Sequence, residues 1–300
     1  RNADSLCDEL RKLKIDDAWI HEIMRRKVVN DRNELRRRAR EEPEAVTQQL
    51  LAGVQAALGP DFDISKHFTP QYRPMQQRIA FVPEGDLFKA VRSGQASVVT
   101  DEIDEFTETG IRLKSGDTLE ADIVITATGF NLSVLGDIPF VIDGKPLVFS
   151  ETVTYRGIMF TGVPNMVWVR GYSYYSWTLR VDLIGDFVCR LLQHMKRKNA
   201  KRVVPKLRSV DADMELGPWD DPTRFNPGYL LRGLHLLPKR GDKPEWGHSQ
   251  DYTFESAALP TIDLDDEVFE YTLEQPVQLS GYHSAQKERN AFHGSDLKAG

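Results

Sequence analysis

The sequence feature that most constrains this chain is an apolar run that ends in a glycine-containing turn, ADIVITATGF at residues 121–130. Residues 123–126 have the β-branched, apolar character of a buried strand. The run stops at Ala127-Thr128-Gly129-Phe130, where small side chains precede an aromatic one. Two interpretations follow. Either a core strand leaves its sheet through a turn that needs a positive φ, or small residues let the backbone approach a dinucleotide beyond the carboxyl end of the strand.

Charge and cysteine content bound the class of protein. A formal charge of −6 over 300 residues argues against a nucleic-acid binder and against binding to an anionic membrane surface. No run of eighteen apolar residues occurs, so we expect no transmembrane helix and no membrane partner. Cys7 and Cys189 lie far apart and the histidines show no ligand spacing. We therefore expect no disulfide framework, no metal site and a cytoplasmic location.

Residue patterns predict helices first, then a β-meander, then one long helix. Asp4, Asp16 and Asn33 are candidate N-caps, and Pro43 suits the first turn of a helix that ends at Gly59. Two later helices are predicted at 87–92 and 176–197. Short strands are expected at 78–82, 97–100, 103–106, 111–113, 119–126, 157–161 and 166–170. After residue 205 the sequence predicts a packed, irregular wrap, and residues from 280 onward are expected to be disordered.

A second informative feature is the strand–turn–helix pattern at residues 166–180. The predicted strand meets Gly171, and the stretch Tyr172-Ser173-Tyr174-Tyr175-Ser176 leads to the start of the long helix. Free N–H groups and the positive helix end favour negative charge there, such as a reduced flavin carries near N1 and O2. The alternative is a core helix with ordinary capping by Ser176. Arg78, in the loop YRPMQQR, is by itself open to a surface ion pair or a catalytic role.

Together these segments resemble the C-terminal half of class B flavoprotein monooxygenases, the family that holds the Baeyer–Villiger and flavin-containing monooxygenases. EADIVITATGF is similar to the A-T-G-[F/Y] segment that links the family's NADP and FAD domains. MFTGVPNMVWVRGYSYYSWTL is similar to its second FAD segment, and YRPMQQRIAFVPEGDLFKAV to the segment with its active-site arginine. The resemblance spans roughly residues 5–250. Residues 171–175 depart from the G-P-G-S-P turn of many Baeyer–Villiger members, which makes the substrate pocket unfamiliar.

The resemblance implies roles for individual residues. Arg78 would be the catalytic residue that steadies the anionic flavin peroxide and the nicotinamide, a task that suits a guanidinium because it keeps its proton. Gln77 stands where a residue often helps to select the 2′-phosphate, so the choice between NADPH and NADH stays open. The substrate side would be lined by Tyr172, Tyr174 and Tyr175, whose alternative role is packing. The other cofactor-binding residues would be Thr128, Gly129, Phe130, Gly171, Ser176 and Trp177.

The implied fold class is α/β, an incomplete flavoprotein fold of two dinucleotide-binding domains with a helical insertion. We expect a helical insertion (1–65), the C-terminal part of the NADP-binding domain (66–128), the second segment of the FAD-binding domain (129–205) and an irregular wrap with a tail (206–300). No G-x-G occurs in the chain. Both Rossmann fingerprints are therefore expected in a missing N-terminal half of the same protein, and we expect this chain alone to be inactive.

The implied function is that of an FAD-dependent, NAD(P)H-consuming monooxygenase. It would insert one atom of O2 into a ketone or heteroatom of a small organic substrate through a C4a-peroxyflavin. Three alternatives stay open. They are a flavin-dependent N-hydroxylase, a disulfide-reductase-like enzyme with an upstream cysteine pair, and a non-catalytic interaction module that keeps the flavoprotein scaffold.

Overall fold

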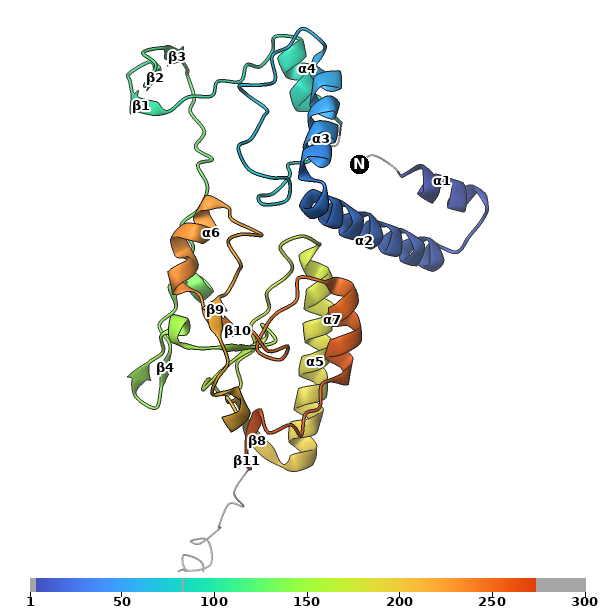
Figure 1. Ribbon diagram of the computed structural model, residues 1–300, viewed down its shortest axis with the longest axis vertical. Coiled ribbons are helices and arrows are strands. Elements are labelled where there is room, and N and C mark those ends of the chain that lie inside the picture. Colours follow the sequence, from blue (N-terminus) through green and yellow to red (C-terminus); the bar gives the residue numbers. More distant parts are fainter. Residues whose placement is uncertain (1–3, 83, 274–300) are drawn as a thin grey trace, which may run out of the picture.

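The computed structural model describes residues 4–82 and 84–273, and the tail predicted from residue 280 lies outside these ranges. The chain mixes helices and strands, which is compatible with the α/β class. Figure 1 shows the first four helices and a small sheet at one end, and a body built around α5 (Trp177–Lys198) at the other. Across the described ranges, no helix is long and apolar enough to cross a membrane.

The N-terminal third is helical, as its capping residues predict. The helices are α1 (Ser5–Lys12), α2 (Asp17–Glu41), α3 (Pro43–Leu58) and α4 (Asp86–Arg92). The Asp4 and Asp16 carboxylates accept hydrogen bonds from the backbone N–H groups of Leu6 and Ala18, at 3.0 and 2.9 Å. Helix α3 begins at Pro43 and ends before Gly59, whose φ is 101°. These cap predictions are confirmed.

The predicted helix start at Asn33 is wrong, because α2 runs through that position without a break. Ion pairs one turn apart support the continuous helix, such as Arg25–Glu22 and Arg37–Glu34, both at 2.7 Å. The Asn33 side chain accepts a hydrogen bond from the Tyr175 hydroxyl instead of capping a helix. Asn33 thus joins α2 to the start of α5.

The β-meander forms a three-stranded antiparallel sheet in the order β1 (Ile103–Phe106), β2 (Gly110–Leu113) and β3 (Thr118–Glu120). Gly110 is required at its place, because a Cβ there would lie 2.0 Å from the Leu119 carbonyl oxygen. Gly116 turns the chain between β2 and β3 with a φ of 98°. The strands predicted at 103–106 and 111–113 are therefore confirmed.

The apolar run at residues 121–130 is not a buried strand. Strand β3 ends at Glu120, and residues 121–133 have no regular secondary structure. Ile123 and Ile125 are 80% and 86% exposed. Within the described residues no strand pairs with this segment, and residues 122–131 are exposed. The strands predicted at 78–82, 97–100 and 166–170 are likewise absent from the described structure.

The predicted long helix is confirmed as α5, with Ser176 as its N-cap residue. Its buried face carries Ile184, Phe187, Leu191 and Met195. This face packs with β8 (Ala200–Pro205), β11 (Phe269–Leu273) and the 3-10 helix η5 (Leu259–Thr261) into the main hydrophobic core. Helix α7 (Tyr252–Ala258) lies beside α5 (Figure 1). β8 and β11 pair antiparallel, so the last described strand returns to the strand that follows α5 (Figure 1).

The wrap after residue 205 is packed as predicted, and it also holds short regular elements. The Trp219 and Trp246 side chains are fully buried in it. Every pair of named strands among the described residues is antiparallel. The remaining elements are β4 (Val141–Ile142), β5 (Lys145–Pro146), β6 (Thr154–Tyr155), β7 (Met159–Phe160), β9 (Leu216–Pro218), α6 (Gly228–Gly233) and β10 (Lys239–Gly241).

Candidate functional site

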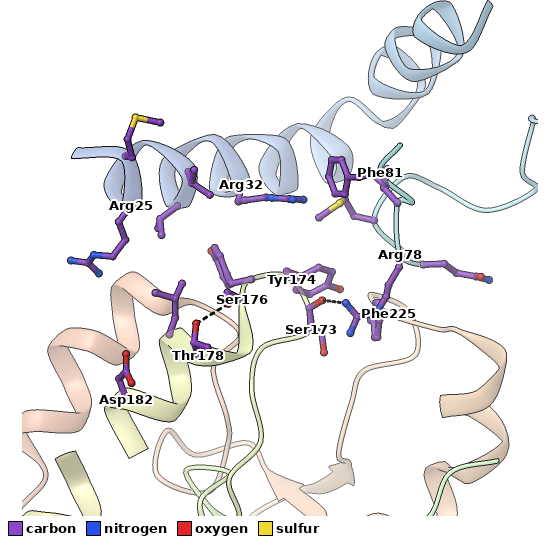
Figure 2. A pocket seen from close by; sticks show the side chains of 18 of the residues that line it. Arg25, Arg32, Arg78, Phe81, Ser173, Tyr174, Ser176, Thr178, Asp182 and Phe225 are labelled. Carbon is purple, nitrogen blue, oxygen red and sulfur yellow. Dashed lines mark hydrogen bonds between the residues drawn. The ribbon is translucent and has the colours of Figure 1, made fainter. Parts of the chain in front are cut away.

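A cavity of about 770 Å³ lies between α2, the loop at residues 75–81 and the turn that leads into α5. We call it the helix-side cavity. Figure 2 shows α2 above it and residues 173–182 below it, with Arg78 and Phe225 at one end. Its apolar wall includes Met24, Val28, Met75, Ile79, Phe81 and Leu179, and its charged residues are Arg25, Arg32, Arg78 and Asp182. A large, mostly apolar cavity with a few polar groups suits a small organic ligand.

Arg78 stands at the boundary of two cavities. Its Nη1 donates a hydrogen bond to the Ser173 carbonyl oxygen at 3.3 Å, and its guanidinium lies 5.8 Å from the ring centre of Phe225 (Figure 2). Besides the helix-side cavity, it lines a second cavity of about 360 Å³ that also touches Gly171, Ser173 and Trp177. We call this one the turn cavity. The structure thus brings Arg78 together with the predicted residues at the start of α5.

Gly171 and Trp177 fit each other closely. A Cβ at Gly171 would lie 2.3 Å from Trp177 Cγ, so only glycine allows this approach. Trp177, the first residue of α5, keeps 53% of its surface exposed. Glycine at this position therefore has a packing reason, and both residues line the turn cavity.

The start of α5 lacks the expected side-chain cap. Ser176 is the N-cap residue, but its hydroxyl pairs with the Thr178 hydroxyl at 2.8 Å and makes no capping hydrogen bond (Figure 2). The interpretation of ordinary capping by Ser176 is therefore wrong. The positive end of the helix stays without a side-chain acceptor, and Ser176 and Thr178 both line the helix-side cavity.

The three predicted substrate-side tyrosines have different surroundings. Tyr172 is fully buried, and its hydroxyl donates to Glu255 Oε2 at 2.7 Å. Tyr174 faces the helix-side cavity, donates to the Arg224 carbonyl oxygen at 3.2 Å, and burial raises its pKa to about 12. Tyr175 lines the same cavity, but its hydroxyl is committed to Asn33.

The ATGF turn lies beside the site rather than in it. Gly129 has a φ of 93°, as a turn that needs glycine would have, and nothing lies within 4 Å of a Cβ built there. Phe130 is 72% exposed, and its ring contacts Tyr229, which lines the turn cavity. Residues 132–136 also line that cavity, whereas Thr128 and Gly129 line neither the turn cavity nor the helix-side cavity. Gln77 lines the helix-side cavity.

Sequence reasoning missed a buried ion pair that holds the turn before α5. Arg180 is fully buried, and its Nε donates to Glu255 Oε2 at 2.8 Å. Its other nitrogens donate to the carbonyl oxygens of Arg170 and Arg156, at 2.9 and 2.8 Å. Because Glu255 also accepts from Tyr172, this pair fixes the backbone on both sides of Gly171. A signal was present, since Arg180 precedes Ile184 by four residues on the buried face of α5.

Sequence reasoning also missed a second cluster of buried polar residues, around Asp220 and His248. Arg170 Nη2 contacts Asp220 Oδ2 at 3.0 Å, and His248 lies against Trp219 with ring centres 4.0 Å apart. Burial raises the pKa of Asp220 and lowers the pKa of His248 well below its ordinary value. Arg180, Arg170 and Arg240 add to the lowered pKa of His248, which is therefore neutral at pH 7.

No family model matches the chain, but several curated proteins do. "FAD-containing monooxygenase EthA" of Mycobacterium tuberculosis is 41% identical over 256 residues, which is 84% of this chain and 51% of that protein. "Probable FAD-binding monooxygenase AlmA" of Acinetobacter baylyi is 38% identical over 270 residues, 89% of this chain and 53% of that protein. "Putative FAD-containing monooxygenase MymA" of Mycobacterium tuberculosis is 38% identical over 257 residues, 86% of this chain and 51% of that protein.

The chain thus spans about half the length of the curated relatives that it matches. The matches cover the three segments on which the resemblance was based, because they extend over most of the chain. The protein belongs to the family of FAD-containing monooxygenases, the Baeyer–Villiger type class B flavoprotein monooxygenases that its motifs resemble.

Proposed function

We propose that this chain is part of an FAD-dependent, NAD(P)H-consuming monooxygenase that inserts one atom of O2 into a ketone or heteroatom of a small organic substrate. The observation that carries the proposal is the position of Arg78. It lies where the helix-side cavity meets the turn cavity, beside the uncapped start of α5. Both the guanidinium and the helix end favour negative charge in the same place.

The described residues fit one end of FAD. The turn at 171–176 offers backbone groups and the start of a helix, and Gly171 and Trp177 form part of the wall. A pyrophosphate site is not expected within this chain, since it contains no G-x-G. We therefore propose that an N-terminal half supplies both fingerprints. We propose the same four domain segments as the sequence predicts: the helical insertion (1–65), the end of the NADP-binding domain (66–128), the second FAD segment (129–205) and the C-terminal wrap (206–300). Together they would form an incomplete fold of two dinucleotide-binding domains.

A bound flavin would supply the redox chemistry that links the nicotinamide cofactor to O2. The chain's own residues would supply charge and exclude water. Arg78 provides a cation that keeps its proton, and the Phe225 ring lies beside its guanidinium. NADPH is proposed as the nicotinamide cofactor on the family resemblance. NADH is kept as the alternative, because Gln77, beside Arg78, carries no charge that would select a 2′-phosphate.

The helix-side cavity is the proposed substrate site. Tyr174 and Leu179 lie on its wall, opposite Met24 and Val28 of α2. Tyr172 would support this wall from behind, because its hydroxyl is bound to Glu255. We also propose a cytoplasmic location, since Cys7 and Cys189 are both free thiols.

The test is Arg78→Ala in the full-length enzyme that contains this chain. Product oxygenation should fall by about 100-fold or more, while flavin absorbance and NADPH oxidation persist, because the lost group acts on developing negative charge. Arg112→Ala on β2, which removes an exposed arginine paired with Asp104, is the matched control. An unchanged rate of product formation in Arg78→Ala would overturn the proposal.

A further inference from the structure

A third cavity, of about 450 Å³, is lined by Tyr174 together with Trp219, His248 and Gln250, and the proposed chemistry does not use it. We call it the arginine-rimmed cavity. It shares Met75, Tyr174 and Phe225 with the helix-side cavity, so a common wall separates the two. The arginines that line it are Arg36, Arg40, Arg73, Arg224 and Arg240.

Two buried side chains that line this cavity have hydrogen-bonding atoms without partners. Trp219 Nε1 is one of them, and both ring nitrogens of His248 are the others. The His248 side chain is 5% exposed, so bulk water does not satisfy it. An indole N–H can only donate, and a neutral imidazole donates from one nitrogen. The buried end of the cavity therefore has at least two donors and needs an acceptor.

The carboxylates that line the cavity are already paired. Asp220 contacts Arg170 at 3.0 Å, and Asp221 contacts Arg224 at 3.3 Å. Asp251 accepts a hydrogen bond from the Phe254 backbone N–H at 3.1 Å. The cavity thus keeps its cationic character in spite of these three acids.

Two of the arginines are available to a ligand. Arg73 Nη2 donates to the Thr223 carbonyl oxygen at 3.2 Å, and Arg240 Nε donates to the Pro218 carbonyl oxygen at 3.0 Å. Neither makes an ion pair with a carboxylate of the described residues. A guanidinium has five N–H donors, so most of the donors of both arginines are left for an incoming group.

We propose that the arginine-rimmed cavity binds a small molecule through a phosphate or carboxylate group. Arg73 and Arg240 would hold the oxyanion, and Trp219 and His248 would donate to its oxygens from the buried end. This inference stands apart from the proposed oxygenation chemistry, because it uses other residues and needs no flavin.

The test uses the full-length protein that contains this chain, labelled with 15N-tryptophan. The indole N–H signal of Trp219 is assigned with Trp219→Phe, and inorganic phosphate or acetate is titrated at constant ionic strength with chloride as the balancing anion. A saturable shift of this signal is expected. Saturation by phosphate alone identifies a phosphate site, and saturation by acetate alone identifies a carboxylate site.

Two charge variants give the decisive comparison. Arg240→Gln and, separately, Arg73→Gln should each weaken binding about 10-fold, because each removes a charge-assisted hydrogen bond. Arg26→Gln on α2 removes the same charge from an exposed side chain outside the cavity and should leave the affinity unchanged. The proposal is overturned if the Trp219 signal does not saturate with either anion. It is also overturned if both cavity variants, checked for native circular dichroism, bind as tightly as Arg26→Gln.

Discussion

Apolar side chains of similar kind are buried in the body around α5 and exposed in the segment at residues 121–133. On α5, Ile184 and Phe187 are buried against strands and a helix from the C-terminal part of the chain. In the segment, Ile123 and Ile125 face outward. The difference is the presence of a covering surface, because an apolar side chain is buried only where other elements close over it. Strand-like composition at 121–126 therefore does not make a strand in this chain.

Removal of the Glu255 side chain is expected to destabilise the α5 body more than any other change considered. Glu255→Ala should lower the free energy of unfolding by about 3–5 kcal/mol, because Arg180 would be left buried without its counter-ion. Urea unfolding followed by circular dichroism measures the loss. Glu267→Gln, which removes a negative charge elsewhere, is the control. If Glu255→Ala costs less than about 1 kcal/mol, the ion pair does not hold the body together.

A second test targets the close approach at Gly171. Gly171→Ala should cost about 3 kcal/mol, since the new Cβ would overlap Trp177. Gly185→Ala is a matched control inside α5, where nothing lies within 4 Å of a Cβ, and it should stabilise the protein by up to about 1 kcal/mol. Thermal unfolding distinguishes the two. Equal melting temperatures for the two variants would contradict the packing shown here.

A third test uses pH. Burial keeps the pKa of His248 well below its ordinary value, so the unfolded chain takes up a proton at a pH where the folded chain does not. The contribution of neutral His248 to the free energy of unfolding is therefore complete above about pH 6.5. As the pH falls below that value, the free energy of unfolding decreases by about 1.4 kcal/mol per pH unit. Urea unfolding at pH 7.5, 6.5 and 5.5 measures the slope. His248→Gln should reduce it and the exposed His235→Gln should not; the reverse result would count against a buried, neutral His248.

The smallest expected effect lies in the exposed segment. Ile125→Ala should change the stability of this chain by less than about 0.5 kcal/mol, whereas Ile184→Ala should cost about 2–5 kcal/mol. Both variants remove the same atoms, so unfolding measurements compare the two environments directly. A loss above about 1 kcal/mol for Ile125→Ala would show that the segment is covered in solution.

Local rules predicted much of the fold. Asp4, Asp16, Pro43 and Gly59 mark helix ends because capping depends on a few neighbouring residues. The meander turn at Gly116 follows from the same kind of rule. The predicted helix start at Asn33 was wrong, and the Asn33 side chain instead accepts a hydrogen bond from Tyr175 in the turn before α5.

The candidate site was predicted in part. The sequence singled out Arg78, Gly171 and Trp177, and the structure places all three on one cavity. It did not separate Tyr172, which is buried and lines the turn cavity, from Tyr174, which lines the helix-side cavity, because an irregular turn carries no periodicity that would assign a face. The Thr128 and Gly129 positions rest on the family resemblance alone.

The sequence by itself determined the helix ends at Asp4, Asp16, Pro43 and Gly59, the turns that need glycine and, through three ordered segments, the family. Only the tertiary structure decided that Arg180 meets Glu255 and that Arg78 meets Ser173, contacts that join residues 75 and 95 positions apart. It also decided that the arginine-rimmed cavity exists. Capping and turn preferences act over a few residues, whereas these contacts form only when distant segments are held together by a common core.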